Sequence, residues 1–415
     1  MSEASTLSLN LSETDREYLL STQAIRDRCR QVLKASDAGK SLFLVDRTRY
    51  QELANYVAEV TQKNYPDLKV PFHSRWKHFD VGQIPRLKNL ENKIAGLSLL
   101  ERLKVKTDLV ITSVLVDAGA GMKWSFKDPE HNFSCGKSEG LALASLYAFM
   151  RGAFSSNPKN PLQVDALGLE NLSWEQFQKD FQITPENPMD GDRGRFELLK
   201  NLGKTLKTQT EFFGNEARLG NLCSTWEQIA HDPGSLPATA ILRSLQDSLG
   251  SIWPGRISVD GYNLGDVWPC PALGTGKDAL VPFHKLSQWL SYSLIDPIME
   301  AGIPVKNITD LTGLAEYRNG GLLIDFGVLK LRHPGDLKKI HKTSDPFIVE
   351  WRALTLAVID EWAPIFRKKL NVTESNLPLG KVLEAGTWWA GRKIAAERRK
   401  DGSSPVQIAS DGTVF

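Results

Sequence analysis

The sequence has few cysteines, no long apolar run and almost no excess charge. Its four cysteines are far apart and form no CxxC pair, so neither a cysteine zinc site nor a disulfide framework is indicated. The longest apolar run, residues 109–116, is too short to cross a bilayer. The 51 basic and 49 acidic residues leave a formal charge of +2, which argues against nucleic-acid binding through a broad basic surface.

The N-terminus has neither the basic segment nor the apolar run of a signal peptide. We therefore expect a soluble, cytoplasmic protein with reduced thiols. Residues 1–13, where Ser and Thr are frequent, are expected to be disordered. Residues 14–415 are expected to form a single helical domain, with a surface lobe at about residues 161–190.

Apolar residues recur every three or four positions through most of the chain. This spacing predicts helices at residues 14–35, 49–62, 97–117, 141–151, 192–208, 283–298, 349–362 and 378–399. Strand-like runs are few and short, at residues 42–45 and 322–326. The sequence therefore predicts a mainly α fold with a few short strands.

Residues 281–331 combine an amphipathic helix with a polar loop. Along this helix one line of polar side chains lies beside the apolar stripe: Lys285, Gln288, Tyr292 and Asp296. Lys and Tyr side chains at the edge of a core would account for that line without a ligand. The loop places an acid, a phenol and a guanidinium directly before Asn319 and two glycines: Glu316, Tyr317 and Arg318. That combination resembles a site more than a linker.

A second polar cluster places His73, Arg75, Trp76, His78 and Asp80 within eight residues. Two histidines and an aspartate could bind a metal, but their spacing is not that of a known metal-binding helix. Arg and His donors beside an exposed indole favour a loop that binds an anion or a sugar.

A third segment contains Trp124 and, before the predicted helix at 141–151, Ser138. Ser138 is a suitable N-cap, and the helix N-terminus behind it would offer N–H groups to an anion. Simple capping explains Ser138 without a ligand.

Several motifs together resemble the uracil catabolism protein 4 family of fungi and bacteria. They are PFHSRW, KSEGLA, FHKLSQWL, LTGLAEYRNGG and the final SDGTVF, and they span about residues 15–415. More distantly, the chain resembles the queuosine 5'-phosphate N-glycosylases, or queuosine salvage proteins. Their pattern F-[HY]-K-x-x-Q-x-L is matched by Phe283, His284, Lys285, Gln288 and Leu290.

Further matches to the glycosylases lie on both sides of this pattern. Their Asp-Tyr-Arg is met by Glu316, Tyr317 and Arg318, so the catalytic aspartate is replaced by a side chain one methylene longer. The other matching residues are Trp124 and Ser125 before Gly136, then Glu350, Arg352, Val382, Leu383 and Trp389. The resemblance implies a helical DNA-glycosylase-like fold and hydrolysis of the N-glycosidic bond of a ribose 5-phosphate derivative.

The likeness to uracil catabolism proteins implies a substrate derived from uridine 5'-phosphate. Ribosylurea 5'-phosphate would give ribose 5-phosphate and urea or a ureido fragment, and the scheme requires no metal or organic cofactor. Such hydrolysis passes through an oxocarbenium-like state that a carboxylate can stabilise. We assign that role to Glu316, with Lys285 positioning it or holding a ribose hydroxyl.

The remaining candidates would bind the substrate. Arg318, Arg75 and the helix N-terminus at Ser138 are candidates for the 5'-phosphate, and Trp124 and Trp76 for stacking on the base. Three further residues complete the predicted binding set: His73, His284 and Tyr317. We expect residues 70–82, 118–140, 281–331 and 379–392 to meet at one pocket.

Two alternatives remain open: a non-catalytic nucleotide-binding protein of the same pathway, and a metal-dependent amidohydrolase that uses His73, His78 and Asp80. The expected partner is a small phosphorylated ribosyl compound, with no nucleic acid or membrane. The sequence assigns no oligomeric state.

Overall fold

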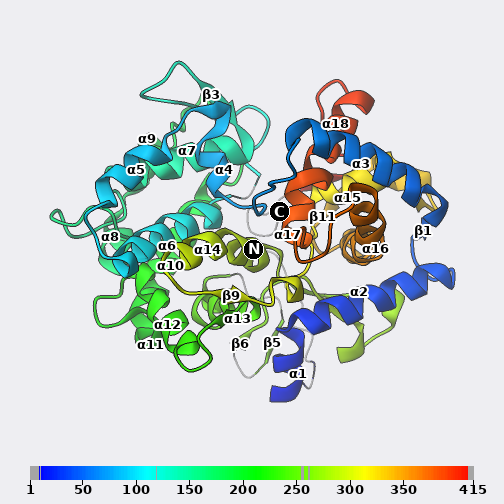
Figure 1. The fold of residues 1–415 in the computed structure, drawn as a ribbon, viewed down its shortest axis with the longest axis horizontal. Coiled ribbons are helices and arrows are strands. Elements are labelled where there is room, and N and C mark those ends of the chain that lie inside the picture. Colours follow the sequence, from blue (N-terminus) through cyan, green and yellow to red (C-terminus); the bar gives the residue numbers. More distant parts are fainter. Residues whose placement is uncertain (1–8, 10, 118, 254–256, 260–261, 410–415) are drawn as a thin grey trace. The chain divides into compact units, whose positions relative to one another are not determined.

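The computed structural model describes residues 9, 11–117, 119–253, 257–259 and 262–409. Helices dominate, and the short strands pair in two-stranded sheets (Figure 1). The predicted mainly α fold is confirmed. Within the described residues, no helix has the length and apolar character needed to span a membrane.

The chain divides into two compact units, each discontinuous in sequence. The described part of unit 1 comprises residues 9, 11–73, 257–259, 262–288 and 307–409, and that of unit 2 comprises residues 74–117, 119–253 and 289–306. The helical periodicity of the sequence did not indicate this division. The single domain over residues 14–415 stays a prediction, as does the surface lobe, whose residues fall within unit 2.

The longest helix of unit 1 is its centre. This helix, α16 (Pro346–Leu370), packs against α2 (Thr22–Asp37) and α3 (Tyr50–Asn64). It begins with a proline at its first position and ends at Asn371 in the left-handed conformation, a typical start and stop. The other helices of unit 1 are α1 (Glu13–Leu19), α15 (Tyr317–Asp325), α17 (Leu379–Val382), the π-helix η9 (Leu383–Thr387) and α18 (Trp388–Arg398).

The strands of unit 1 form four small sheets. The antiparallel pairs are β1 (Phe43–Val45) with β10 (Leu329–Leu331), β5 (Ser258–Val259) with β6 (Tyr262–Asn263), and β7 (Val267–Pro269) with β8 (Leu280–Pro282). The parallel pair is β11 (Ile340–Lys342) with β12 (Gln407–Ala409).

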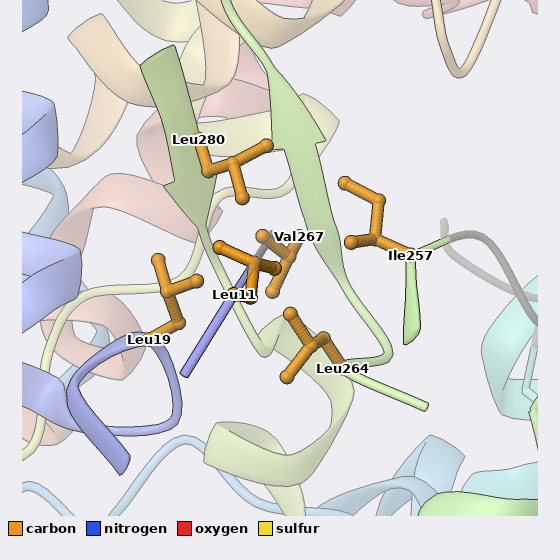
Figure 2. Close-up of a cluster of buried hydrophobic side chains, with 6 residues drawn as sticks. All are labelled: Leu11, Leu19, Ile257, Leu264, Val267 and Leu280. Carbon is orange, nitrogen blue, oxygen red and sulfur yellow. The ribbon is translucent and has the colours of Figure 1, made fainter. Parts of the chain in front are cut away.

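A small hydrophobic cluster holds the N-terminal end of unit 1 (Figure 2). Its members are Leu11, Leu19, Ile257, Leu264, Val267 and Leu280. Leu11 is buried in this cluster, and Ser12 caps α1. The ordered chain therefore extends before residue 14, where the sequence predicted disorder; residues 1–8 and 10 lie outside the described residues.

Unit 2 is built around two buried helices, α6 (Leu99–Leu115) and α7 (Lys137–Met150), which pack together. Its other helices are α4 (Trp76–Phe79), α5 (Leu87–Ile94), α8 (Ala166–Asn171), α9 (Trp174–Asp180), α10 (Asp192–Thr208), α11 (Thr210–Phe213), α12 (Cys223–His231) and α13 (Ala238–Leu249). Its strands pair as β2 (Ser125–Lys127) with β3 (Ser134–Gly136) and β4 (Leu236–Pro237) with β9 (Val305–Lys306).

Helix α14 (Lys285–Glu300) contributes its first turn to unit 1 and its remainder to unit 2. Short 3₁₀ turns complete the regular structure: η1 (Arg47–Arg49), η2 (Val81–Gln83), η3 (Leu219–Leu222), η4 (Gly250–Ile252), η5 (Pro271–Leu273), η6 (Lys277–Ala279), η7 (Ile308–Asp310) and η8 (Pro334–Lys338).

Two predicted elements are wrong, and a third is a helix with an irregular turn. The helix predicted at 14–35 is broken, because the Ser21 side chain accepts the Ala24 N–H and starts a second helix. The strand predicted at 322–326 is instead the last part of helix α15 and its C-cap, Phe326. The helix predicted at 378–399 contains the π-helix η9, which inserts a wider turn at residues 383–387.

Candidate functional site

Helix α15 begins at Glu316, the candidate catalytic carboxylate. Glu316 is the N-cap, with extended backbone, and its side chain is 8% exposed. Its Oε1 accepts the Asn319 N–H at 2.8 Å, and its Oε2 accepts the Arg318 N–H at 3.0 Å. Because each oxygen has a backbone donor, the carboxylate has a defined orientation at a helix N-terminus, where negative charge is favoured.

Two glycines bring other helices close to the first turn of α15. A Cβ on Gly320 would lie 2.7 Å from the indole of Trp351 in α16. A Cβ on Gly391 in α18 would lie 2.5 Å from the carbonyl oxygen of Arg318. Any side chain at either position would therefore push a neighbouring helix away from the Glu316 cap.

Arg318 is covered by the segment that follows α18. Its guanidinium donates to the Gly402 carbonyl at 2.9 Å and lies 5.0 Å from the ring centroid of Tyr317. At the other end of α15, Asp325 forms a bidentate ion pair with Arg399. The Arg318 guanidinium thus already donates to one backbone carbonyl, and its contact with a 5'-phosphate stays a prediction.

The start of α14 is anchored by buried polar contacts. His284 is 4% exposed, has φ +45°, and its Nε2–H donates to the Leu19 carbonyl at 2.8 Å. Burial lowers the pKa of His284, which favours the neutral ring. This buried hydrogen bond gives His284 a structural role, and contact with substrate stays a prediction.

Asp266 holds the neighbouring residue, Lys285, through its backbone. The Asp266 carboxylate accepts the Lys285 N–H at 3.1 Å and a bidentate pair from Arg352 at 2.8 and 2.7 Å. Burial alone would raise the pKa of Asp266, but Arg352 and the other donors together hold it well below its usual range. The ion pair therefore fixes the backbone position from which the Lys285 side chain extends.

Two buried side-chain amides of unit 1 have one end bonded to protein. Gln288 Oε1 accepts the Thr312 N–H at 3.4 Å, and Asn319 Nδ2 donates to the Leu314 carbonyl at 3.1 Å. The other ends, Gln288 Nε2 and Asn319 Oδ1, are buried and have no hydrogen-bond partner among the described residues. The motif match included Gln288, whereas nothing singled out the side chain of Asn319.

A second buried carboxylate, Glu384, lies on the π-helix η9. It is 3% exposed and accepts the Tyr65 hydroxyl at 2.7 Å and the Trp389 indole N–H at 3.4 Å. Its Oε2 lies 2.9 Å from His73 Nδ1. Burial, and then the Glu384 charge, raise the pKa of Tyr65, so the phenol remains a donor.

Sequence reasoning missed Glu384. The motif match included Val382, Leu383 and Trp389 but not the acid between them. The signal that could have found the residue is a single acid within an otherwise apolar, small or aromatic run, where an unpaired charge would be costly to bury. The η9 turn packs against α15, so unit 1 places Glu384 and Glu316 on neighbouring elements.

In unit 2, Arg75 is fully buried and bonded to protein acceptors. Its Nε donates to Ser113 Oγ at 2.7 Å, and its Nη1 pairs with Asp117 at 2.7 Å and reaches the Ser138 carbonyl at 3.0 Å. Burial lowers the pKa of Arg75, and Asp117 acts in the opposite direction. These contacts make Arg75 a structural ion-pair partner, and its role in phosphate binding stays a prediction.

Ser138 is not the N-cap that the sequence predicted. Helix α7 begins at Lys137, with Gly136 as its N-cap, two residues before Ser138. The Ser138 hydroxyl donates instead to the Asp117 carboxylate, at 2.8 and 2.7 Å from its two oxygens. The N-cap prediction is wrong because Ser138 lies within the first turn of α7, where its hydroxyl oxygen accepts from Arg75 Nη1 at 3.1 Å.

The two tryptophans predicted to stack on a base both donate to backbone carbonyls of unit 2. Trp124 is 1% exposed, with its indole N–H on the Phe181 carbonyl at 2.9 Å. Trp76 is half-buried, with its N–H on the Ser293 carbonyl at 2.7 Å. Protein encloses the Trp124 ring, whereas Trp76 retains an accessible part. Stacking on a base stays a prediction for both.

The histidines and aspartate of the metal hypothesis make other contacts. His73 pairs with Glu384, His78 Nδ1 lies 3.1 Å from Ser138 Oγ, and Asp80 accepts the Leu87 N–H at 3.0 Å. In the part of the chain that the structure describes, no three His, Cys, Asp or Glu side chains form a group suited to a metal. The predicted common pocket draws on both units and stays a prediction.

Comparison with known proteins gives strong matches along nearly the whole chain. A family model described as "Protein of unknown function (DUF1688)" matches residues 18–415. The chain is 40% identical to Protein urg3 of Schizosaccharomyces pombe over 407 residues, covering 96% of this chain and 98% of that protein. It is 36% identical to Uracil catabolism protein 4 of Lachancea kluyveri over 434 residues, with the same coverage of 96% and 98%.

The resemblance deduced from the sequence motifs is thereby confirmed for the family, although the final motif, residues 410–415, lies outside the described residues. The more distant likeness to queuosine salvage glycosylases stays a prediction. The match over residues 18–415, together with these two identities, shows that the chain belongs to the DUF1688 family, which includes uracil catabolism protein 4.

Proposed function

We propose that this protein hydrolyses the N-glycosidic bond of a ribose 5-phosphate derivative in uracil catabolism. The name of a relative at 36% identity, uracil catabolism protein 4, supports the pathway. The observation that carries the reaction type is the Glu316 carboxylate, buried and oriented by two backbone N–H groups at the start of α15. The substrate proposed is ribosylurea 5'-phosphate, with ribose 5-phosphate and urea as products.

The arrangement suits an oxocarbenium-like transition state. As the C1'–N bond breaks, positive charge develops on C1' and the ring oxygen, and a fixed carboxylate stabilises it more than it stabilises the neutral substrate. Water then adds to C1', and Glu316 accepts the proton that this water loses. The Glu316 side chain is already held in place by its cap bonds, so little reorganisation is needed during the reaction.

Lys285 is proposed as the second active residue. Its backbone is fixed by the Asp266–Arg352 ion pair, and its side chain would hold a ribose hydroxyl or position Glu316. Arg318 and Tyr317, in the first turn of α15, would contact the sugar phosphate. The scheme requires no metal or organic cofactor.

The test uses purified protein and three substrates: ribosylurea 5'-phosphate, unphosphorylated ribosylurea and uridine 5'-phosphate. Products are identified by mass spectrometry, with the Glu316→Gln protein as the matched control. We expect ribose 5-phosphate and urea from the first substrate, and much slower turnover of the unphosphorylated compound. Tight binding of the nucleotide or the ribosylurea without turnover would show a binding protein and overturn the proposal.

A further inference from the structure

A cavity of about 660 Å³ lies within unit 2. Its wall is formed by α6, α11, the turn η3 and the segments next to them, and α6 and α11 both pack against η3. The volume falls within the range of roughly 300–1,000 Å³ of small-molecule sites. Because the side chains on the wall are mostly polar, a ligand of this cavity should be a small polar molecule.

The two cations on the wall differ in their partners. Arg218 is 8% exposed, and its guanidinium is paired with two carboxylates, Asp108 at 3.0 Å and Glu101. Lys104 of α6 is half-buried, and its Nζ donates to Asn221 Oδ1 at 3.0 Å. Within the described part of the chain, the Lys104 side chain has no carboxylate partner. An ammonium group has three N–H donors, so Lys104 keeps an uncompensated charge and spare donors at the cavity.

The carboxylates on the wall differ in the same way. Asp165 is the N-cap of α8, and its oxygens accept the backbone N–H groups of Ser156 and Gly168, each at 2.8 Å. Glu211 and Glu216 are exposed, and neither side chain has a hydrogen bond or ion pair among the described residues. The cavity therefore carries one cation and two carboxylates that the protein itself does not pair.

The Asn221 amide separates Lys104 from Glu216. Its Oδ1 accepts from the Lys104 ammonium group at 3.0 Å. Its Nδ2 lies 3.3 Å from the position that a Cβ on Gly214 would take, and Glu216 Oε2 lies 2.7 Å from the same position. The positive and the negative group are thus near the two ends of one side-chain amide, without forming an ion pair. A molecule with an anionic and a cationic group a few bonds apart fits this separation.

A buried donor gives independent support for a ligand with an anionic group. Arg218 Nη2 is buried and has no hydrogen-bond partner among the described residues. An unpaired buried donor is costly, and a carboxylate is a strong acceptor for a guanidinium group. Phe212, also on the wall, is half-buried and offers an apolar surface to the rest of the ligand.

We propose that unit 2 binds a free amino acid in this cavity. The ligand carboxylate contacts Lys104 and Arg218, and the ligand ammonium group contacts Glu216 and Glu211. A zwitterion complements both sets of charges, whereas a simple anion is repelled by the two carboxylates and a simple cation by Lys104. This inference goes beyond the proposed function and does not depend on it.

The test measures binding to the purified full-length protein by isothermal titration calorimetry. The probes are the twenty amino acids at millimolar concentration, and we expect binding by at least one that has an apolar or aromatic side chain. Two blocked forms of that amino acid are then compared: the carboxamide, which lacks the carboxylate, and the N-acetyl derivative, which lacks the ammonium group. Either block should weaken binding about ten- to a hundredfold, because a charge-assisted hydrogen bond is lost.

Two variants assign these contacts to residues. Lys104→Met and Glu216→Gln should each weaken binding of the free amino acid about ten- to a hundredfold. The matched controls are Lys179→Met and Glu175→Gln, which change exposed residues of α9 outside the cavity and should leave the affinity unchanged.

The variants and the blocked ligands together form a double-mutant cycle. Lys104→Met should weaken binding of the N-acetyl derivative but not that of the carboxamide, which has already lost the group that contacts Lys104. Glu216→Gln should weaken binding of the carboxamide but not that of the N-acetyl derivative.

Three outcomes would overturn the proposal. The first is no binding by any of the twenty amino acids. The second is binding that neither Lys104→Met nor Glu216→Gln weakens, because the ligand would then lie elsewhere. The third is an equal effect of each variant on the free and the blocked forms, which would show general disruption of the cavity. Glu216 is exposed, so Glu216→Gln should fold and can decide the test alone. No hydrolysis is measured here, and a failure leaves the proposed function standing.

Discussion

Replacing Glu316 by Gln separates the structural role of this residue from its chemical role. In the folded protein each carboxylate oxygen accepts one backbone N–H, at 2.8 and 3.0 Å. The Gln amide has a single oxygen, so one of these N–H groups would face an amide NH₂ group instead. Losing part of an N-cap costs about 1 kcal/mol, within the range of 0.5–2 kcal/mol found for such caps.

The expected loss of catalysis is much larger than this structural cost. Removing one electrostatic group from a preorganised active site lowers turnover by about 10²–10³-fold. A stability loss of about 1 kcal/mol leaves nearly all molecules folded, since domains are stable by roughly 5–15 kcal/mol. Reduced kcat in Glu316→Gln would therefore report the lost charge rather than unfolding.

Glu316→Asp is the matched variant. Aspartate is a preferred N-cap and keeps the charge, so the melting temperature should change little. The carboxylate would lie about 1.5 Å further back, and misplacement of about 1 Å can cost a hundredfold in rate. The assay measures kcat and KM on ribosylurea 5'-phosphate and the thermal unfolding of all three proteins. Wild-type kcat in Glu316→Gln would refute the reasoning and leave Glu316 as a helix cap.

Three further predictions concern other parts of the molecule. Asp266→Asn should destabilise the protein by about 3–5 kcal/mol in denaturant unfolding, because Arg352 would stay buried without its partner. Since the pKa of Asp266 is lowered in the folded state, the stabilisation by this ion pair should be present above about pH 4 and be lost as the pH falls further. A destabilisation by Asp266→Asn that does not change with pH would contradict the ion pair. Gly386→Ala should cost about 1–3 kcal/mol through overpacking, whereas Gly335→Ala, which has open space around it, should melt like the wild type; equal melting of both would contradict the close packing of η9. Arg75→Ala should lower the melting temperature and leave KM nearly unchanged, because the Arg75 guanidinium is bonded within unit 2. An unchanged melting temperature with a KM raised about ten- to a hundredfold would instead support the phosphate contact.

The mainly helical fold was predictable because it follows from the spacing of apolar residues. The strand predicted at residues 322–326 was wrong because a short apolar run fits a strand or a buried helix turn equally well. What decides between them is the Glu316 cap, and glutamate is an unusual N-cap that the sequence pattern does not identify.

The roles of individual side chains were less predictable than the elements. Arg75 was recognised as a donor and Ser138 as a helix cap, but the acceptor that they share, Asp117, comes from a part of the chain with no motif of its own. Trp124 was expected to face a ligand, and its burial depends on packing that no local pattern encodes. Glu384 was overlooked because its donors, Tyr65 and His73, are more than 300 positions earlier in the chain.

The packing of α2 against α16 has a consequence for synthesis of the protein on the ribosome. Helix α2 ends at Asp37, but α16 covers it only after Leu370 has been made, and β12 closes the C-terminal part of unit 1 at residues 407–409. At about 5–20 residues per second, α2 waits roughly 20–70 s with its apolar face uncovered. The N-terminal segment of a nascent chain therefore needs protection from aggregation until the chain is nearly finished. A ribosome stalled before Glu384 would carry a chain that contains Glu316 but lacks the carboxylate bonded to His73.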